Sequence, residues 1–273
     1  MKRILLTLEY DGTGYAGWQR QINGLAVQQV LEEALTQACQ HTVQVTGASR
    51  TDAGVHATGQ TAHFDTESRI PPDRYPFVLN PLLPPDIRVT QSRAVPPAFH
   101  ARFLSAGKLY TYRIDNSRHG SALNRLYSTH VPVPLDVGAM QAALPALLGT
   151  HDFRAFQASG GTAKTTIRTL HSAKLEQTGD LLTLRVEGNA FLYNMVRIIA
   201  GTLIEIGHAK KPVTAFADAF RTGSRLSLGL TAPASGLELT RVYYLPEAFE
   251  HPETLRWHQE PTKEAGACSE SPD

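Results

Sequence analysis

An aspartate stands between an arginine and a glycine turn in residues 49–56, which read SRTDAGVH. The segment follows a short apolar run, so we expect it at the rim of a sheet, where loops commonly carry chemistry. Presented in this way, the carboxylate of Asp52 is a candidate nucleophile or general base. A plain turn is the alternative, because Asp accepts backbone hydrogen bonds and Gly tolerates positive φ. Local chemistry alone favours the turn.

An arginine on an apolar helix offers a partner for a carboxylate. The apolar residues of 190–206 form one broad face, and Arg197 points away from it. Its neighbours four and seven positions on are Gly201 and Ile204, not the charged residues of a solvated face. A half-buried guanidinium needs a carboxylate, because an unpaired buried charge is costly. Capping of carbonyls or contact with solvent would explain Arg197 equally well.

Basic and aromatic residues are interleaved in residues 108–113, which read KLYTYR. A strand of this kind can stack bases and hold phosphates, as in sheet-based RNA binders. For a single residue such as Tyr110, an ordinary strand with its tyrosines facing a core is the commoner situation. The pattern makes Tyr110 a candidate for base binding without establishing it.

Other kinds of site find little support in the sequence. Eleven histidines are present, but neither His-Glu-x-x-His nor a Cys pair accompanies them, so we predict no metal site. The glycine-rich residues 10–21 precede neither a dinucleotide fingerprint nor a P-loop lysine, so no nucleotide cofactor is indicated. No Gly-x-Ser-x-Gly elbow and no obvious second carboxylate accompany Asp52. A single-acid mechanism is left.

Composition is that of a globular protein. The chain has 273 residues, 42% of them hydrophobic and 19% charged, enough for one large domain or two ordinary ones. A formal charge of only +1 means that an RNA-binding surface would have to gather its basic residues on one side. Two cysteines give no disulfide framework and fit a reducing compartment. The N-terminal apolar run is too short for a signal peptide or membrane span and is predicted to be a strand.

The spacing of apolar residues predicts alternating strands and helices. Strands are expected at residues 2–9, 43–46, 58–64, 87–95, 108–115, 165–176 and 181–187, with a last edge strand at 241–244. Helices are expected at residues 25–40, 72–83, 136–148 (interrupted by Pro145) and 190–206. These elements form two α+β units, residues 1–104 and 105–250, joined near the prolines at 96 and 97. Residues 251–273 are expected to be a disordered tail.

Taken together, the motifs resemble the TruA family of tRNA pseudouridine synthases along nearly the whole chain. The matching segments are YDG at residues 10–12, GWQRQ at 17–21, RTDAGVH at 50–56, LN at 79–80, LLPPDI at 82–87, FHARF at 99–103, HDF at 151–153, NAF at 189–191, MVR at 195–197 and APASGL at 232–237. A small departure is Ser49, where many members have glycine before the arginine.

The resemblance implies a fold, a reaction and roles for four residues. The fold would be two ferredoxin-like (RRM-like) halves whose mainly antiparallel sheets join, flanked by helices, around a central basic cleft. The reaction would be isomerisation of uridine to pseudouridine at positions 38, 39 and 40 of the tRNA anticodon stem-loop. Asp52 would be the catalytic aspartate, Arg50 would displace and replace the target base, Tyr110 would pack on the uridine, and Arg197 would pair with Asp52.

The same resemblance implies a cytoplasmic homodimer that binds tRNA and needs no cofactor, metal or membrane. Asp52 could attack C1′ of the ribose as a nucleophile or remove a proton from C2′ as a base, and the residues leave both routes open. We expect the Arg197 pair to be bidentate, holding the geometry of the carboxylate and lowering its pKa. An RNA-binding module and a uracil-releasing hydrolase are the rival functions.

Overall fold

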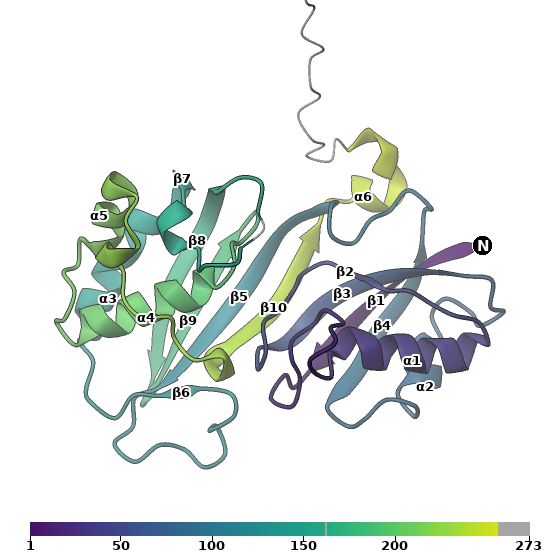
Figure 1. Cartoon of the computed structure of the whole chain (residues 1–273), viewed down its shortest axis with the longest axis horizontal. Coiled ribbons are helices and arrows are strands. Elements are labelled where there is room, and N and C mark those ends of the chain that lie inside the picture. Colours follow the sequence, from purple (N-terminus) through teal and green to yellow (C-terminus); the bar gives the residue numbers. More distant parts are fainter. Residues whose placement is uncertain (162, 256–273) are drawn as a thin grey trace, which may run out of the picture.

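The computed structural model describes residues 1–161 and 163–255. Its strands form a single ten-stranded sheet in the order β4-β1-β3-β10-β5-β9-β8-β7, with β2 (Thr46–Gly47) paired to β3 and β6 (Thr129–His130) to β5. Neighbours along this order are antiparallel except β10 and β3. Helices accompany both halves of the sheet (Figure 1). The α+β fold class predicted from the sequence is confirmed.

One half of the sheet contains β1 (Lys2–Tyr10), β3 (His56–Thr66) and β4 (Ile87–Val95), with α1 (Val27–Cys39) and α2 (Tyr75–Leu79) packed beside them (Figure 1). Alternate residues of β1 are fully buried in the core: Ile4, Leu6 and Leu8. This period of two is the pattern of a strand that covers a core with one face. The bounds of β4 confirm the strand predicted at 87–95. The helix predicted at 25–40 is also confirmed, with two residues fewer at its start and one fewer at its end.

The other half contains β5 (Ser105–Asp115), β7 (Gly149–Asp152), β8 (Ile167–Thr178) and β9 (Leu181–Gly188). Its helices are α3 (Val137–Ala143), α4 (Met195–Gly207) and α5 (Ala215–Thr222) (Figure 1). A 3₁₀ turn at Leu144–Leu147 continues α3, in line with the interruption predicted at Pro145. On β5, Tyr112 and Ile114 are fully buried, and Tyr110 shares their face because it lies two residues before Tyr112.

The last long strand, β10 (Leu237–Tyr244), joins the two halves. It runs antiparallel to β5 and pairs in parallel with β3 through Glu238 opposite His56 and Leu239 opposite Ala57. The prediction of an edge strand at 241–244 is therefore wrong in both length and position. Apolar alternation marks which face of a strand is buried, but it does not specify the neighbours of that strand.

Some boundaries also differ from the sequence-based predictions. β2 lies at Thr46–Gly47 instead of 43–46, and α4 begins at Met195 instead of 190 because Asn194 adopts a left-handed backbone (φ 60°). β6, β7 and α5 were not predicted. α6 (Glu247–Glu250) ends just before the predicted tail, residues 251–273. The first residues of that tail form a 3₁₀ turn at Pro252–Thr254, in which Pro252 is buried. Residues 256–273 of that predicted tail lie outside the described residues.

Helix α4 is fastened along one side to residues 229–232. Ala232 N donates to the Arg197 carbonyl (3.1 Å), and Gly229 N donates to Thr202 Oγ1 (2.9 Å). The chains approach so closely at Gly201 that a Cβ there would lie 1.8 Å from the carbonyl oxygen of Leu230. Glycine at this position lets the segment that contacts Arg197 lie directly against the helix.

We predict that Gly201→Ala destabilises the fold by about 1–3 kcal/mol, because the overpacking outweighs the better helix propensity of alanine. Thermal unfolding would show this as a melting temperature lowered by several degrees. Gly14→Ala is the matched control, since a Cβ at Gly14 meets no atom within 4 Å. Equal melting temperatures for the two variants would contradict the close approach.

Candidate active site

The Asp52 segment is a turn held by the N-terminal loop. Within residues 52–55 the Val55 N–H donates to the Asp52 carbonyl (3.1 Å), and Gly54 has φ +77°. Trp18 N–H donates to the Thr51 carbonyl at 3.0 Å. The turn predicted as the alternative to a catalytic role is present, and it presents the Asp52 side chain with 23% of its surface exposed. A turn and a reactive carboxylate are therefore compatible here.

Arg197 meets Asp52 across 145 residues of sequence. Its Nη1 lies 3.5 Å from Asp52 Oδ2, and the two side chains are 19% and 23% exposed respectively. Arg197 also donates from Nε to the Ala232 carbonyl (2.8 Å) and from Nη1 to Asn194 Oδ1 (2.8 Å). Both explanations of its sequence position therefore hold, because the guanidinium faces a carboxylate and also caps a carbonyl.

The Asp52–Arg197 pair differs from the expected one in its geometry, and its effect on the pKa of Asp52 is outweighed by burial. It is a single long contact from Nη1, not a bidentate one, and Nε donates to the Ala232 carbonyl instead. Burial raises the pKa of Asp52 above its ordinary value, and the charge and hydrogen bond of Arg197 lower it by a smaller amount. Arg197 thus lowers the pKa of Asp52 as predicted, but loss of solvent outweighs this effect and leaves the pKa raised overall.

Tyr110 is held in place at its hydroxyl and along its ring. The hydroxyl is 2.8 Å from Ser49 Oγ, and the ring meets the Phe191 ring edge-on with centroids 5.0 Å apart. Only 7% of Tyr110 is exposed, and burial raises its pKa to about 12. The phenol therefore remains protonated at neutral pH. The negative charge of Asp52 adds to this rise in the pKa of Tyr110, so the two groups are close enough to interact electrostatically.

Gln60 was missed by the sequence analysis, although it anchors the segment before Asp52. It is fully buried on β3, where its Oε1 accepts from the Ser49 N–H (3.2 Å) and its Nε2 donates to the Ser49 carbonyl (2.7 Å). The amide thus pairs with Ser49 as a neighbouring strand would, while the Ser49 hydroxyl meets Tyr110. A glutamine within an apolar strand pattern was the available signal, because a buried amide must find partners.

Arg50 is exposed on the Asp52 loop. In residues 1–161 and 163–255 it makes no ion pair, and its positive charge helps to lower the pKa of Arg102. The four residues predicted for the site are thus distributed as follows: Asp52 and Arg197 are in contact, Tyr110 is joined to their loop through Ser49, and Arg50 extends toward solvent.

Other polar groups near this region have structural partners. His56 is buried, with Nδ1 accepting from the Gly12 N–H (3.0 Å) and Nε2 donating to the Leu126 carbonyl (2.8 Å). No group of three or more His, Cys, Asp or Glu in the described residues is placed to hold a metal ion. None of the helices in residues 1–161 and 163–255 has both the length and the apolar character needed to cross a membrane.

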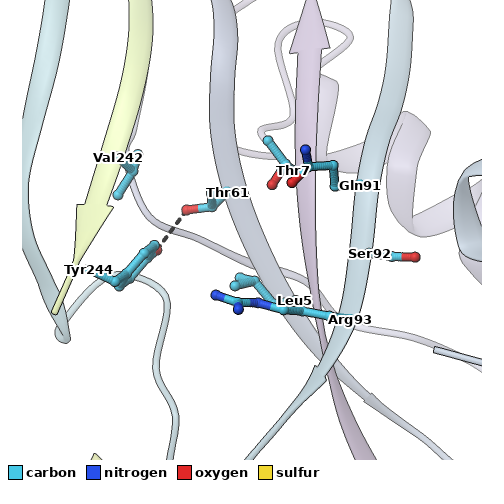
Figure 2. A pocket seen from close by; sticks show the side chains of 8 residues that line it. All are labelled: Leu5, Thr7, Thr61, Gln91, Ser92, Arg93, Val242 and Tyr244. Carbon is cyan, nitrogen blue, oxygen red and sulfur yellow. Dashed lines mark hydrogen bonds between the residues drawn. The ribbon is translucent and has the colours of Figure 1, made fainter. Parts of the chain in front are cut away.

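A hollow of about 300 Å³ lies between strands β1, β3, β4 and β10, away from the predicted residues (Figure 2). Arg93 and Tyr244 extend across it, and the Tyr244 hydroxyl is 2.6 Å from Thr61 Oγ1. None of Arg50, Asp52, Tyr110 and Arg197 lines it. The hollow is therefore separate from the predicted site residues.

Comparison with known proteins identifies the family. A family model described as tRNA pseudouridine synthase matches residues 7–104 and 143–245. tRNA pseudouridine synthase A of Ruminiclostridium cellulolyticum is 48% identical over 89% of this chain and all of that protein, and the Myxococcus xanthus protein of the same name is 46% identical over 89% and 92%. The chain therefore belongs to the TruA family of tRNA pseudouridine synthases, isomerases that convert uridine to pseudouridine.

The chain is also distantly similar to a solved structure, the crystal structure of a Cbf5-Nop10-Gar1 complex. The TM-score is 0.38 and the identity is 15%, over 86% of this chain and 48% of that chain.

We predict that Gln60→Leu lowers kcat by about 10–100-fold. The substitution removes both hydrogen bonds to the Ser49 backbone, which positions Asp52 and Tyr110, and small displacements of reacting groups lower the rate. Turnover of tRNA measured below the melting temperature of the variant checks this. Gln141→Leu is the control: it removes a side-chain hydrogen bond to the Leu175 carbonyl in the other half of the sheet. A kcat for Gln60→Leu as high as that of the control would rule out the anchoring role.

We predict opposite stability effects for two aspartates at pH 7. Arg3 hydrogen bonds, at 2.8 and 2.7 Å, lower the pKa of Asp65, whereas burial raises the pKa of Asp52. Asp65→Asn should cost about 1 kcal/mol in the free energy of unfolding, and Asp52→Asn should cost nothing or stabilise.

The pH dependence gives the sign of each effect. The Asp65 contribution is present above its unfolded pKa and is lost as pH falls through the lower folded value. The ionised Asp52 carboxylate costs stability, and the advantage of Asp52→Asn appears as pH rises through the raised folded value. Denaturant unfolding from pH 8 down to below the ordinary aspartate pKa of about 4 measures both. Equal losses for the two variants at pH 7 would contradict the raised pKa of Asp52.

Proposed function

We propose that the chain isomerises uridine at positions 38, 39 and 40 of the tRNA anticodon stem-loop, with Asp52 as the catalytic residue. The observation that supports this most is the Asp52 carboxylate, partly exposed and partly desolvated, beside the Arg197 guanidinium at 3.5 Å. The relatives named tRNA pseudouridine synthase A support tRNA as the substrate.

The reaction breaks the N-glycosidic bond, turns the uracil, joins C5 to the ribose C1′ and releases the hydrogen of C5 as a proton. Asp52 acts either by attacking C1′ or by removing a proton from C2′, since an ionised carboxylate suits both routes. No electrons are gained or lost, so the isomerisation requires no redox cofactor. Base and sugar both remain in the RNA.

The roles of the other residues follow from where they lie. Arg197 keeps Asp52 ionised when a bound base excludes water, because a nearby positive charge favours the carboxylate. Tyr110 packs against the uracil, its hydroxyl held by Ser49. Extracting a base costs a few kcal/mol of stacking and pairing, and the exposed Arg50 offsets part of this cost by filling the gap. We further propose that the protein works as a homodimer in the cytoplasm.

The decisive experiment uses tRNA tritiated at C5 of uridine. The wild-type protein should release tritium to water while the base stays in the RNA as pseudouridine. Asp52→Asn should lower turnover by at least about 10³-fold while binding tRNA as before. Arg88→Ala is a control for the general loss of a charge, because Arg88 donates to the Pro84 and Ile87 carbonyls.

Each rival function makes a different prediction for this experiment. A uracil-releasing hydrolase would yield free base instead of pseudouridine. A simple RNA-binding module would release no tritium, and Asp52→Asn would be indistinguishable from the wild-type protein. Either result would overturn the proposed function.

A further inference from the structure

Four positive side chains lie in a row that leads from the Asp52 loop to β8. Arg50 is electrostatically coupled to Arg102 in the loop before β5, and Lys108 on β5 is coupled to both Arg102 and Arg168 on β8. We call Arg102, Lys108 and Arg168 the cationic triad. Its members come from three places in the sequence, so the fold and not a charge run in the chain gathers them.

The strand register places Lys108 and Arg168 on the same face as Tyr110. Lys108 precedes Tyr110 by two residues on β5, so the two side chains share a face with roots about 7 Å apart. Across the sheet, Lys108 pairs with Gly188 and Gly188 pairs with Leu170. Arg168 lies two residues before the buried Leu170 and shares its face. Because Gly188 carries no side chain, nothing from β9 projects between Lys108 and the β8 residues.

The triad has no anionic partner in the part of the chain that the structure describes. No member forms an ion pair there, and Arg168 Nε is buried without a hydrogen-bond partner. Arg113, in the same strand as Lys108, provides the contrast: it lies on the opposite face and pairs with Glu238 at 2.8 Å. Arg102 is exposed, whereas Lys108 and Arg168 are half-buried. Partly desolvated cations are normally paired, so two of them without an anion, beside a third positive charge, indicate a ligand that brings negative charge.

Among residues 1–161 and 163–255, the groups that act electrostatically on Lys108 are positive. Arg102 faces it from the preceding loop and Arg168 from β8, while Gly188 on β9 and Val242 on β10 are the uncharged residues opposite it in register. Burial, together with the charges of Arg102 and Arg168, lowers the pKa of Lys108 to about 8. A phosphate would reverse this balance, since an adjacent negative charge favours the protonated amine.

We propose that Arg102, Lys108 and Arg168 bind one backbone phosphodiester of the RNA strand beside the uridine held at Asp52 and Tyr110. The inference rests on the proposed function and adds to it a specific anchoring point on the strand. Arg supplies fork-shaped donors that match phosphate oxygens, and Lys supplies a compact charge. Fixing the phosphate next to the target nucleotide holds the ribose in register with Asp52.

The first test neutralises phosphates one at a time. Synthetic anticodon stem-loop RNAs carry a single methylphosphonate at each position around the target uridine, and their binding is measured in the Asp52→Asn background. We expect one position to weaken binding about tenfold with Lys108 present and to have no effect in Lys108→Met. The salt dependence of log Kd should decrease in slope by about 1 in Lys108→Met.

Lys174→Met is the matched control, because Lys174 is an exposed lysine on β8. A melting temperature for Lys108→Met equal to that of wild type, or full rescue by Lys108→Arg, separates phosphate binding from damage to the fold. If Lys108→Met and Lys174→Met show the same phosphate profile and the same salt slope, the triad does not bind phosphate.

The second test uses pH. Because protonated Lys108 binds the phosphate, wild-type affinity should fall by about tenfold from pH 7 to 9, whereas Lys108→Arg should stay nearly constant with the same RNA. Parallel pH profiles for the two proteins would overturn the proposal. These measurements need no turnover, so a failed isomerisation assay with an intact phosphate profile would reject the proposed function and leave the phosphate site standing.

Discussion

The rest of the site depends on a carboxylate that is kept partly out of water opposite a single arginine. Asp52 and Arg197 stand 145 residues apart and meet only because β10 joins the two halves of the sheet. The N-terminal loop holds one partner through Thr51, and residues 229–232 hold the other through Ala232. A shift of either the N-terminal loop or residues 229–232 would separate the two charges, because each half of the sheet contributes only one of them.

The ionised Asp52 carboxylate lowers the free energy of unfolding, and we propose that it is kept for its chemistry. Burial opposes the charge on Asp52 more than Arg197 favours it, so the folded protein keeps a carboxylate whose pKa is raised. Tyr110 and Gln60 are different, because their polar atoms are satisfied by Ser49. Asp52 is thus the less satisfied member of a surrounding network that is otherwise well paired, as is common where a protein keeps a group for function.

The sequence predicted those features that depend on local pattern. The strand at 87–95 and the uncharged helical neighbourhood of Arg197 both follow from periodicity. The cost of an unpaired charge made a carboxylate one of two explanations for Arg197, and only the family resemblance pointed to Asp52 as that carboxylate. The central position of β10 could not be inferred, because strand order depends on long-range pairing. The two hydrogen bonds between Gln60 and the Ser49 backbone could not be inferred either, because a glutamine in a strand does not indicate which residue it will bind. The hydrogen bond from Arg197 to the Ala232 carbonyl could not be inferred either, because local pattern does not place residue 232 beside residue 197.

The central claim is that Asp52 is a desolvated carboxylate that Arg197 helps to keep ionised. Carbon NMR titration of the Asp52 carboxyl group, in protein labelled at aspartate and assigned with Asp52→Asn, tests it directly in the wild-type protein and in Arg197→Met. The account predicts a pKa above the ordinary aspartate value in the wild-type protein and a still higher pKa in Arg197→Met. A pKa at or below the ordinary value, or the same pKa in both proteins, would contradict it.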